Sequence, residues 1–154
     1  MSIEENKTLV RRYFEDGPAK PDICDEILAP VIRWHAVNHA AGNPDFDSDL
    51  QSEKAAYAWL KTVWGDYRFF IDEIIAEADR VMVRWTFYGT QQGEFQGLPP
   101  THKSVAYSGI NIFHIVDGRI AEIWDIFDRL WLWQQLGVLP ATAEFISKAK
   151  DKIL

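Results

Sequence analysis

The second half of the chain contains four long segments in which large apolar residues alternate with polar ones. The segments span residues 68–79, 80–95, 102–118 and 119–128. An alternation with a period of two predicts β-strands that have two distinct faces. Asp79-Arg80 and Asp117-Gly118 are tight-turn signals between successive strands. Strands joined by such short turns run antiparallel, so the sequence predicts a long antiparallel meander.

The first half of the chain has helical spacing. Ser2 and Glu5 match a capping box, and the helix that begins there should end at Gly17-Pro18. Further helices are predicted at residues 21–28, 50–64, 130–136 and in the C-terminal segment, with an extended segment at 31–39 and a loop at 40–49. Helices first and a strand meander last predict one α+β domain over residues 1–154. Its curled antiparallel sheet would pack on the N-terminal helices and leave a central pocket.

Composition narrows the function classes. The net charge is −7, and no stretch gathers Lys or Arg, so nucleic acid and anionic membrane are not expected partners. Aromatic residues make up 14%, which favours an aromatic-lined cavity or a large subunit interface. The single cysteine, Cys24, excludes an intrachain disulfide and lies on an apolar helix face. A polar, acidic N-terminus and the lack of a ~20-residue apolar run predict a cytoplasmic protein.

One carboxylate interrupts the last apolar strand, RIAEIWDIFDRL. Asp125 is surrounded by isoleucine, tryptophan and phenylalanine, and burial costs an unpaired carboxylate several kcal/mol. A three-residue turn at 116–118 would place Gly109 opposite Asp125, whereas a two-residue turn would place Ile110 there. We expect the three-residue turn. Asp125 then shares a face with Tyr107, Gly109, Asn111 and Phe127, where Gly109 leaves open space and Asn111 and Tyr107 offer hydrogen bonds. Alternatively, Asp125 faces solvent or a partner subunit and pairs with Arg84 or Arg129.

Several other residues are candidates for the pocket. His35 and His39 are four residues apart, but they lie in an extended segment without a metal-binding context. We therefore expect them at the pocket mouth, or as surface or core histidines, and predict no metal site. Trp64 on the long helix and Trp85 on an apolar strand face are candidates for the pocket wall. Asp128 precedes the helix at 130–136 and is interpreted as its N-cap.

Residues 80–140 resemble the SnoaL-like polyketide cyclases, also called ester cyclases, of the nuclear transport factor 2-like superfamily. The shared marks are G-T-x-x-G-E-F-x-G-x-P-P-T, G-I-x-I-F-x-I-x-D-G-R-I-x-E-x-W-D and the Q-Q-L-G helix. The resemblance implies a cone-like roll and an intramolecular aldol condensation on a polyketide ester, without metal or cofactor. It also implies that Asp125 is the acid–base residue. Asn111 stands where these cyclases have a histidine, and asparagine cannot exchange a proton near neutral pH.

The sequence therefore supports three functions and one assembly. The first function is a cofactor-free cyclase or isomerase that acts on a hydrophobic, polyketide-like carbonyl compound. The second is a binding protein without chemistry, and the third is a hydrolase or dehydratase that would use a second group such as His39 or Asp128. The outward strand face is too apolar for water, which predicts a homodimer with Arg84 and Glu122 in polar contacts. That face carries Met82, Arg84, Tyr88, Ile110, Ile112, His114, Trp124 and Ile126.

Overall fold

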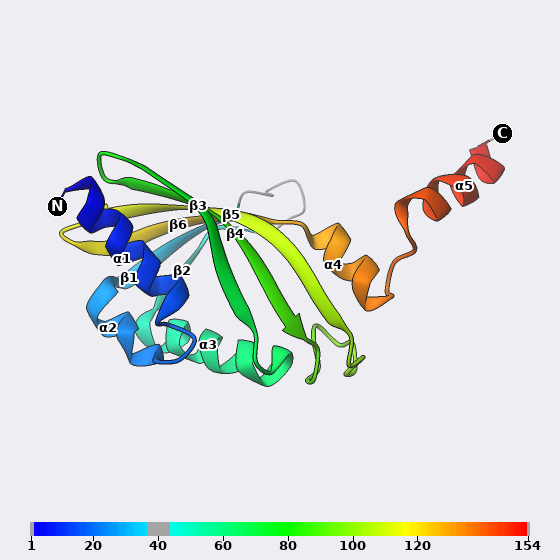
Figure 1. The fold of residues 1–154 in the computed structure, drawn as a ribbon, viewed down its shortest axis with the longest axis horizontal. Helices are drawn as coiled ribbons and strands as arrows, with labels where there is room; N and C mark the ends of the chain where they lie inside the picture. The colour runs from blue at the N-terminus through cyan, green and yellow to red at the C-terminus, as the bar shows by residue number, and fades with distance from the viewer. Residues whose placement is uncertain (1, 37–43, 154) are drawn as a thin grey trace.

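The computed structural model describes residues 2–36 and 44–153, which form a six-stranded sheet with helices before and after it (Figure 1). The N-terminal helices are α1 (Ile3–Glu15), the short 3-10 turn η1 (Pro21–Ile23), α2 (Cys24–Ile27) and α3 (Leu50–Trp64). The strands are β1 (Leu28–Ala36), β2 (Phe46–Asp49), β3 (Arg68–Glu77), β4 (Arg80–Thr90), β5 (Ser104–Val116) and β6 (Arg119–Phe127). Helices α4 (Arg129–Leu136) and α5 (Thr142–Ile153) complete the chain.

The sheet has the strand order β2-β1-β6-β5-β4-β3, and it is mixed. Strands β3 to β6 form the predicted antiparallel meander, but β1 pairs with β6 in parallel. The prediction of a purely antiparallel sheet was therefore wrong, because the early strand joins the edge of the meander instead of extending it by a hairpin. Strand β2 was also missed, since its sequence, FDSD, has no apolar alternation. The α+β class and the curled sheet are confirmed.

One face of the sheet is covered by α1, α2 and α3, and we call it the inner face (Figure 1). The alternation predicted for β4 is confirmed there, because Val81, Val83, Trp85 and Phe87 are all buried. Cys24 is buried as well, and the capping box of Ser2 and Glu5 is present. The core thus lies between the sheet and the three N-terminal helices. No helix in the described ranges is long and apolar enough to cross a membrane.

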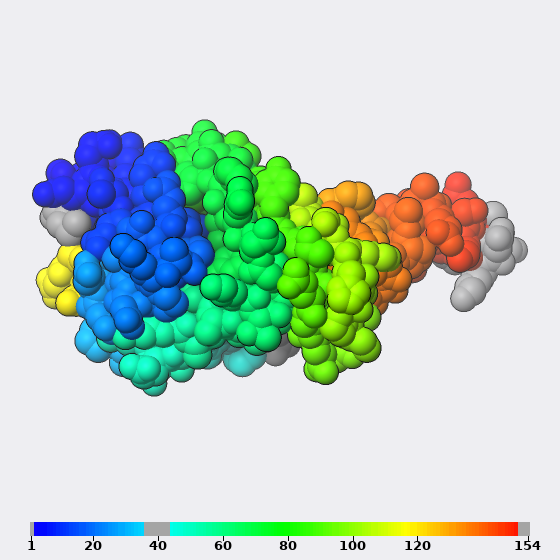
Figure 2. Space-filling model, turned by 60° about the horizontal axis from the view of Figure 1, so that its bottom comes forward, coloured from blue at the N-terminus to red at the C-terminus, as the bar shows by residue number. Residues whose placement is uncertain are grey.

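The opposite face of the sheet, which we call the outer face, is not covered by any helix among residues 2–36 and 44–153. Helix α4 begins at the end of β6, with the Asp128 side chain accepting a hydrogen bond from the Trp131 backbone N–H at 2.8 Å, as predicted for an N-cap. Helix α5 then stands away from the body at the far end of the molecule (Figures 1 and 2). Its Phe145 is 60% exposed, so α5 adds no cover to either face of the sheet.

The β5–β6 hairpin determines which side chains face Asp125. Val116 pairs with Arg119, which leaves Asp117 and Gly118 as a two-residue turn with φ values of 49° and 75°. This corrects the predicted three-residue turn. A β-bulge then shifts the register, since Ile115 pairs with Ile120 but His114 pairs with Glu122. The bulge restores the predicted face for Asp125 and places Asn111, not Gly109, directly opposite it.

Candidate functional site

A cavity of about 570 Å³ opens between the inner face of the sheet and helix α3. This volume suits a small organic ligand of a few fused rings. Six of the residues predicted for the site line it: Trp64, Trp85, Tyr107, Asn111, Asp125 and Phe127. The strands supply most of these side chains, because alternate residues of neighbouring strands point to the same face. The walls are predominantly aromatic, so the few polar groups among them stand out.

Asp125 is the main charged group on the strand side of this cavity. Desolvation by burial raises the pKa of its carboxyl to about 6, and the charge of Arg129 opposes part of that rise. Its carboxylate makes no hydrogen bond or ion pair within 2–36 and 44–153; Arg84 pairs with Asp72 and Glu73 instead. Arg129 lies 4.8 Å from the Phe127 ring centre. The alternative of a structural pair with either arginine is therefore not what the fold forms.

Asn111 lies across the strand pair from Asp125 and is 5% exposed. Its Oδ1 accepts a hydrogen bond from the indole N–H of Trp85. An indole N–H can only donate, so this contact fixes the amide with its oxygen toward Trp85. The NH₂ group makes no hydrogen bond within the described part of the chain. Asn111 can therefore donate to a ligand in the cavity.

Gly109 makes this arrangement possible in a different way from the one predicted. It pairs with Trp85 across strands β5 and β4, and a Cβ atom built on Gly109 would lie 2.3 Å from Cζ2 of that indole. The space beside Asp125 that the sequence suggested is thus filled by the Trp85 ring. Gly109 permits the indole to lie flat over the strand, and that position brings its N–H to Asn111.

Tyr107 supplies a third polar group on the same face as Asp125. Burial and, secondarily, the charge of Asp125 raise the pKa of its hydroxyl above the usual value for tyrosine. The phenol therefore stays protonated at neutral pH and remains a hydrogen-bond donor. Its ring packs against Phe87 and Phe127, with centroids 4.9 Å and 5.4 Å away. These contacts hold the ring in the wall of the cavity.

The two histidine candidates do not join this group. His35 lies on the outer face, stacked on Trp124 at 4.1 Å, with Nε2 2.7 Å from Glu122 and Nδ1 3.1 Å from Asp45. The expectation of His35 at the pocket mouth is corrected, because neighbouring Trp34 takes the inward position. His39 lies outside the described residues. Within those ranges, no group of three or more His, Cys, Asp or Glu side chains is placed to hold a metal ion.

Sequence reasoning missed several cavity residues on the helical side, among them Tyr13 of α1 and Glu53 of α3. Glu53 is only 5% exposed, although its local sequence, QSEKAA, looks like an ordinary polar helix start. Its spacing to Tyr57, Leu60 and Trp64 is helical, and this signal could have placed it on the buried stripe. The cavity thus contains carboxylates on two opposing walls.

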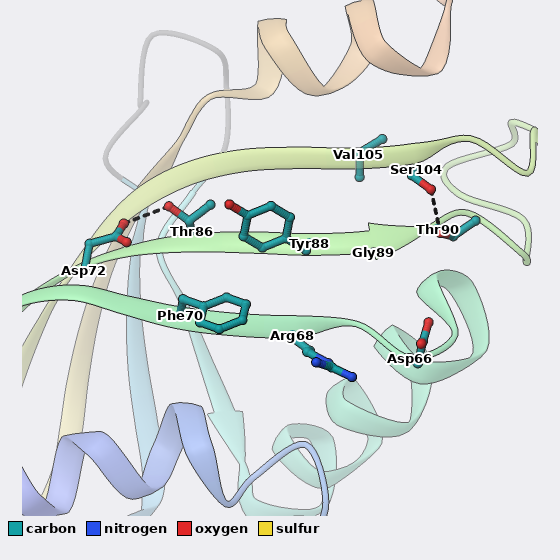
Figure 3. Close-up of a pocket in the computed structure, with 10 residues that line it drawn as sticks. All are labelled: Asp66, Arg68, Phe70, Asp72, Thr86, Tyr88, Gly89, Thr90, Ser104 and Val105. Atoms are coloured by element: carbon teal, nitrogen blue, oxygen red, sulfur yellow. Dashed lines mark hydrogen bonds between the residues drawn. The ribbon is translucent and has the colours of Figure 1, made fainter.

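A second hollow, of about 660 Å³, lies on the outer face over β3, β4 and β5 (Figure 3). Figure 3 shows Phe70 and Tyr88 side by side on neighbouring strands, and their ring centroids are 5.5 Å apart. The carboxylate of Asp72 at its edge accepts hydrogen bonds from Thr86 at 2.7 Å and from Arg84 at 3.1 Å. On this shallow surface the Asp72 carboxylate is therefore paired, whereas Asp125 in the inner cavity is not.

Comparison with known proteins agrees with the geometry. Residues 8–136 match the family described as SnoaL-like polyketide cyclase. The chain belongs to this family. Aklanonic acid methyl ester cyclase DauD from Streptomyces sp. (strain C5) is 30% identical over 133 residues, which cover 84% of this chain and 80% of that protein.

Two solved structures share the fold. AclR from Streptomyces galilaeus, a proposed hydroxylase, has a TM-score of 0.77 and 25% identity, covering 99% of this chain and 93% of its own. A proposed SnoaL-like polyketide cyclase from Jannaschia sp. CCS1 has a TM-score of 0.78 and 23% identity, covering 91% of this chain and 97% of its own. The nuclear transport factor 2-like fold is thus confirmed. Because the fold is shared by proteins with different described activities, the reaction has to be argued from the site.

Proposed function

We propose that the protein catalyses an intramolecular aldol cyclisation of a hydrophobic, polyketide-like carbonyl compound, with Asp125 as general base and then general acid. The observation that carries the proposal is the unpaired Asp125 carboxylate in an aromatic cavity, with a pKa raised to about 6. A base with a raised pKa is better matched to a weakly acidic C–H bond, and it is still mostly ionised at pH 7.

The chemistry follows from the groups around Asp125. Its carboxylate removes a proton from the carbon next to a carbonyl, and the charge develops on the carbonyl oxygen as an enolate forms. The NH₂ group of Asn111 and the hydroxyl of Tyr107 are donors on the same face and would stabilise that oxygen. The enolate carbon then attacks a second carbonyl carbon of the same molecule, forming the C–C bond. The new alkoxide takes the proton back from Asp125, so the reaction is redox-neutral.

The identity of residue 111 determines which residues can transfer the proton. An amide does not exchange protons near neutral pH, so it can orient and stabilise a carbonyl oxygen but cannot serve as a second acid. Trp85 holds the Asn111 oxygen and leaves its donor side for the ligand. Asp125 would therefore carry both proton transfers in this protein. The substrate named for the relative DauD, the methyl ester of aklanonic acid, supports an ester rather than a free acid as the kind of substrate.

The proton-abstraction step can be tested without the natural substrate. We would incubate the protein with 7-hydroxy-1-tetralone, a bicyclic aromatic ketone, in D₂O and follow loss of the α-hydrogen signal by NMR. The parent should accelerate the exchange, and Asp125→Asn should lower the protein-dependent rate at least about hundredfold. Binding of the ketone, measured by tryptophan fluorescence, should stay within about tenfold because Asn preserves the shape of the cavity.

Cyclisation itself is tested with aklanonic acid methyl ester, with the ring-closed product measured by chromatography and mass spectrometry. Asp128→Asn is the matched control, since it also changes a carboxyl to an amide near the end of β6 but affects only the helix cap. It should keep the parent rate. If the parent binds the ketone and the ester but accelerates neither exchange nor ring closure, the proposed enzyme function is wrong and a binding protein is favoured.

A further inference from the structure

Glu53 is a buried carboxylate that the proposed reaction does not use. It lies in the first turn of α3, after the N-cap Asp49, and it lines the cavity from the helical wall. Asp125 lines the same cavity from the strand wall. Glu53 is only 5% exposed, so nearly all of its surface is covered by other residues of the protein. A carboxylate in such a position needs partners, because burial of an unpaired charge is costly.

The partners of Glu53 account for only part of its hydrogen-bonding capacity. The indole N–H of Trp34 on β1 donates to Oε1 at 2.8 Å. Across the described part of the chain, no lysine or arginine pairs with it; the adjacent Lys54 pairs with Asp22 and Asp25 instead. The N-terminal end of α3 favours a negative charge but does not occupy the second oxygen. Glu53 therefore keeps acceptor capacity inside the cavity.

Tyr13 is a further polar residue of this cavity. It comes from α1 and lines the cavity together with both carboxylates. Burial raises the pKa of its hydroxyl well above the usual value, and the charges of Glu53 and then Asp125 add to this rise. The phenol therefore stays protonated at neutral pH. The aromatic cavity thus has polar groups on two walls, with Asp125 and Asn111 on the strands and Glu53 on helix α3.

We propose that Glu53 binds a hydroxyl group of the substrate from the helical wall of the cavity, while Asp125 enolises a carbonyl group of the same molecule from the strand wall. This inference rests on the proposed function and deepens it, because it names a further feature of the substrate. The substrate is a hydroxylated aromatic ketone or ester, and its hydroxyl donates to Glu53. A substrate with a free carboxylate beside Glu53 is repelled, so the site selects neutral molecules.

The test uses two matched ketones, 7-hydroxy-1-tetralone and 7-methoxy-1-tetralone, whose affinities are measured by tryptophan fluorescence at pH 7. A phenol is neutral at this pH and can donate, whereas the methoxy group cannot. The parent should bind the hydroxy ketone at least about tenfold more tightly, as expected for a hydrogen bond to a charged group. Glu53→Gln should reduce this preference to less than about threefold while leaving the affinity for the methoxy ketone nearly unchanged.

Two further variants separate recognition from folding. Glu144→Gln removes a carboxylate from the exposed helix α5 and should keep the parent's preference. Trp34→Phe removes the N–H that orients Glu53 and should lower the preference only in part. Circular dichroism checks that each variant is folded. An equal affinity of the parent for both ketones, an undiminished preference in Glu53→Gln, or no binding of either ketone would overturn the proposal.

This outcome is distinguishable from failure of the proposed function. Hydroxyl preference is measured by binding, whereas the role of Asp125 is measured by hydrogen exchange and ring closure. If the parent prefers the hydroxy ketone through Glu53 but catalyses no exchange, the proposed role of Glu53 is supported and the proposed enzyme function is wrong. If the parent catalyses exchange through Asp125 but shows no preference, the enzyme function is supported and the proposed role of Glu53 is wrong.

Discussion

Strand β6 carries two carboxylates on opposite faces of the sheet, and their environments shift the two pKa values in opposite directions. On the outer face, Glu122 accepts hydrogen bonds from His114 and, at 2.7 Å, from His35, and these contacts lower its pKa. On the inner face, Asp125 has no partner among the described residues, and desolvation raises its pKa to about 6. The same strand thus holds one carboxylate that stabilises its charge and one that is kept reactive.

The comparison extends to the two faces as a whole. On the outer face Asp72 is paired with Arg84 and Thr86, as Glu122 is with two histidines, while the inner cavity holds Asp125 and the partly satisfied Glu53. The apolar residues show the reverse. Those inside are covered by α1 to α3, but Ile110, Ile112 and Ile126 on the outer face are 38%, 40% and 52% exposed. The inner face therefore leaves charges for a ligand, and the outer face leaves hydrophobic surface for a partner.

The largest expected effect concerns the outer face. We propose that a second copy of the chain covers it, because Ile110, Ile112 and Ile126 on two adjacent strands leave large apolar side chains exposed on a face that no described helix packs against. Ile112→Lys with Ile126→Lys would place four charges in a two-fold interface and should raise the dimer dissociation constant more than about thousandfold. Sedimentation velocity at micromolar concentration measures this change.

The control for the dimer is Phe145→Lys with Ile146→Lys on α5, which adds the same charges away from the sheet and should leave the dimer intact. Arg84 and Glu122, predicted to make contacts across the interface, are already paired within their own chain, so their replacement should matter less than that of the isoleucines. A parent that sediments as a monomer would remove the proposed role of the outer face.

The pH dependence of exchange distinguishes the two carboxylates of β6. A general base works only when ionised, so the exchange rate should fall about tenfold per unit below pH 6 and level off above it. Between pH 7 and pH 4 the expected loss is about hundredfold. Glu122→Gln should keep both the rate and the midpoint near 6. A midpoint that moves with Glu122, or no midpoint at all, would contradict the assignment of Asp125 as the base.

Asp125 should change the pH dependence of protein stability in the opposite direction from a usual carboxylate. The folded pKa of Asp125 is about 6, above the ordinary 3.8, so the folded state binds the proton more tightly and loses stability as pH rises between these values. Asp125→Asn should therefore stabilise the protein by up to about 3 kcal/mol at pH 7 and by less than about 1 kcal/mol at pH 4. Urea unfolding at both values measures the difference; a destabilised variant would mean that the carboxylate has a structural partner.

The smallest expected effect is on the outer face. Glu122→Gln keeps the shape of the side chain but weakens its hydrogen bonds to His35 and His114. Because Glu122 is 30% exposed, we expect a loss of only about 1 kcal/mol, measured by urea unfolding at pH 7. His114→Asn provides the matched variant from the other side of the contact. If either variant were more stable than the parent, the contrast between a stabilising Glu122 and a destabilising Asp125 would be wrong.

Much of this arrangement could be predicted from alternation and helical spacing. Alternation placed Asn111 and Tyr107 on one face, and the N-cap role of Asp128 followed from its position before a helix. Those two inferences depend only on neighbours in sequence, which determine the face that a side chain takes. The face of Asp125 was predicted through a three-residue turn that the structure does not form, and it is correct only because the bulge compensates for the two-residue turn.

The remainder depended on contacts distant in sequence. The parallel pairing of β1 with β6 brings Trp34 beside the cavity and turns His35 outward, and nothing in the segment 31–39 encodes its partner strand. Gly109 was interpreted as open space, and this was wrong because the ring of Trp85, which comes from another strand, fills that space. Glu53 is a different case, since its helical spacing to Tyr57 and Trp64 could have placed it on the buried face of α3, but only the structure shows the cavity that it lines.

The bulge between β5 and β6 makes the chemistry of the protein sensitive to the register of one hairpin. Ala121 is the unmatched residue, lying between Ile120, which faces inward, and Glu122, which faces outward. If Ala121 instead paired with His114 in a regular ladder, every later residue of the strand would exchange faces. Trp124 and Ile126 would then enter the cavity, and Asp125 would leave it. A slip of one residue in this pairing could therefore convert an acid–base site into a binding site without its general base while the fold persists.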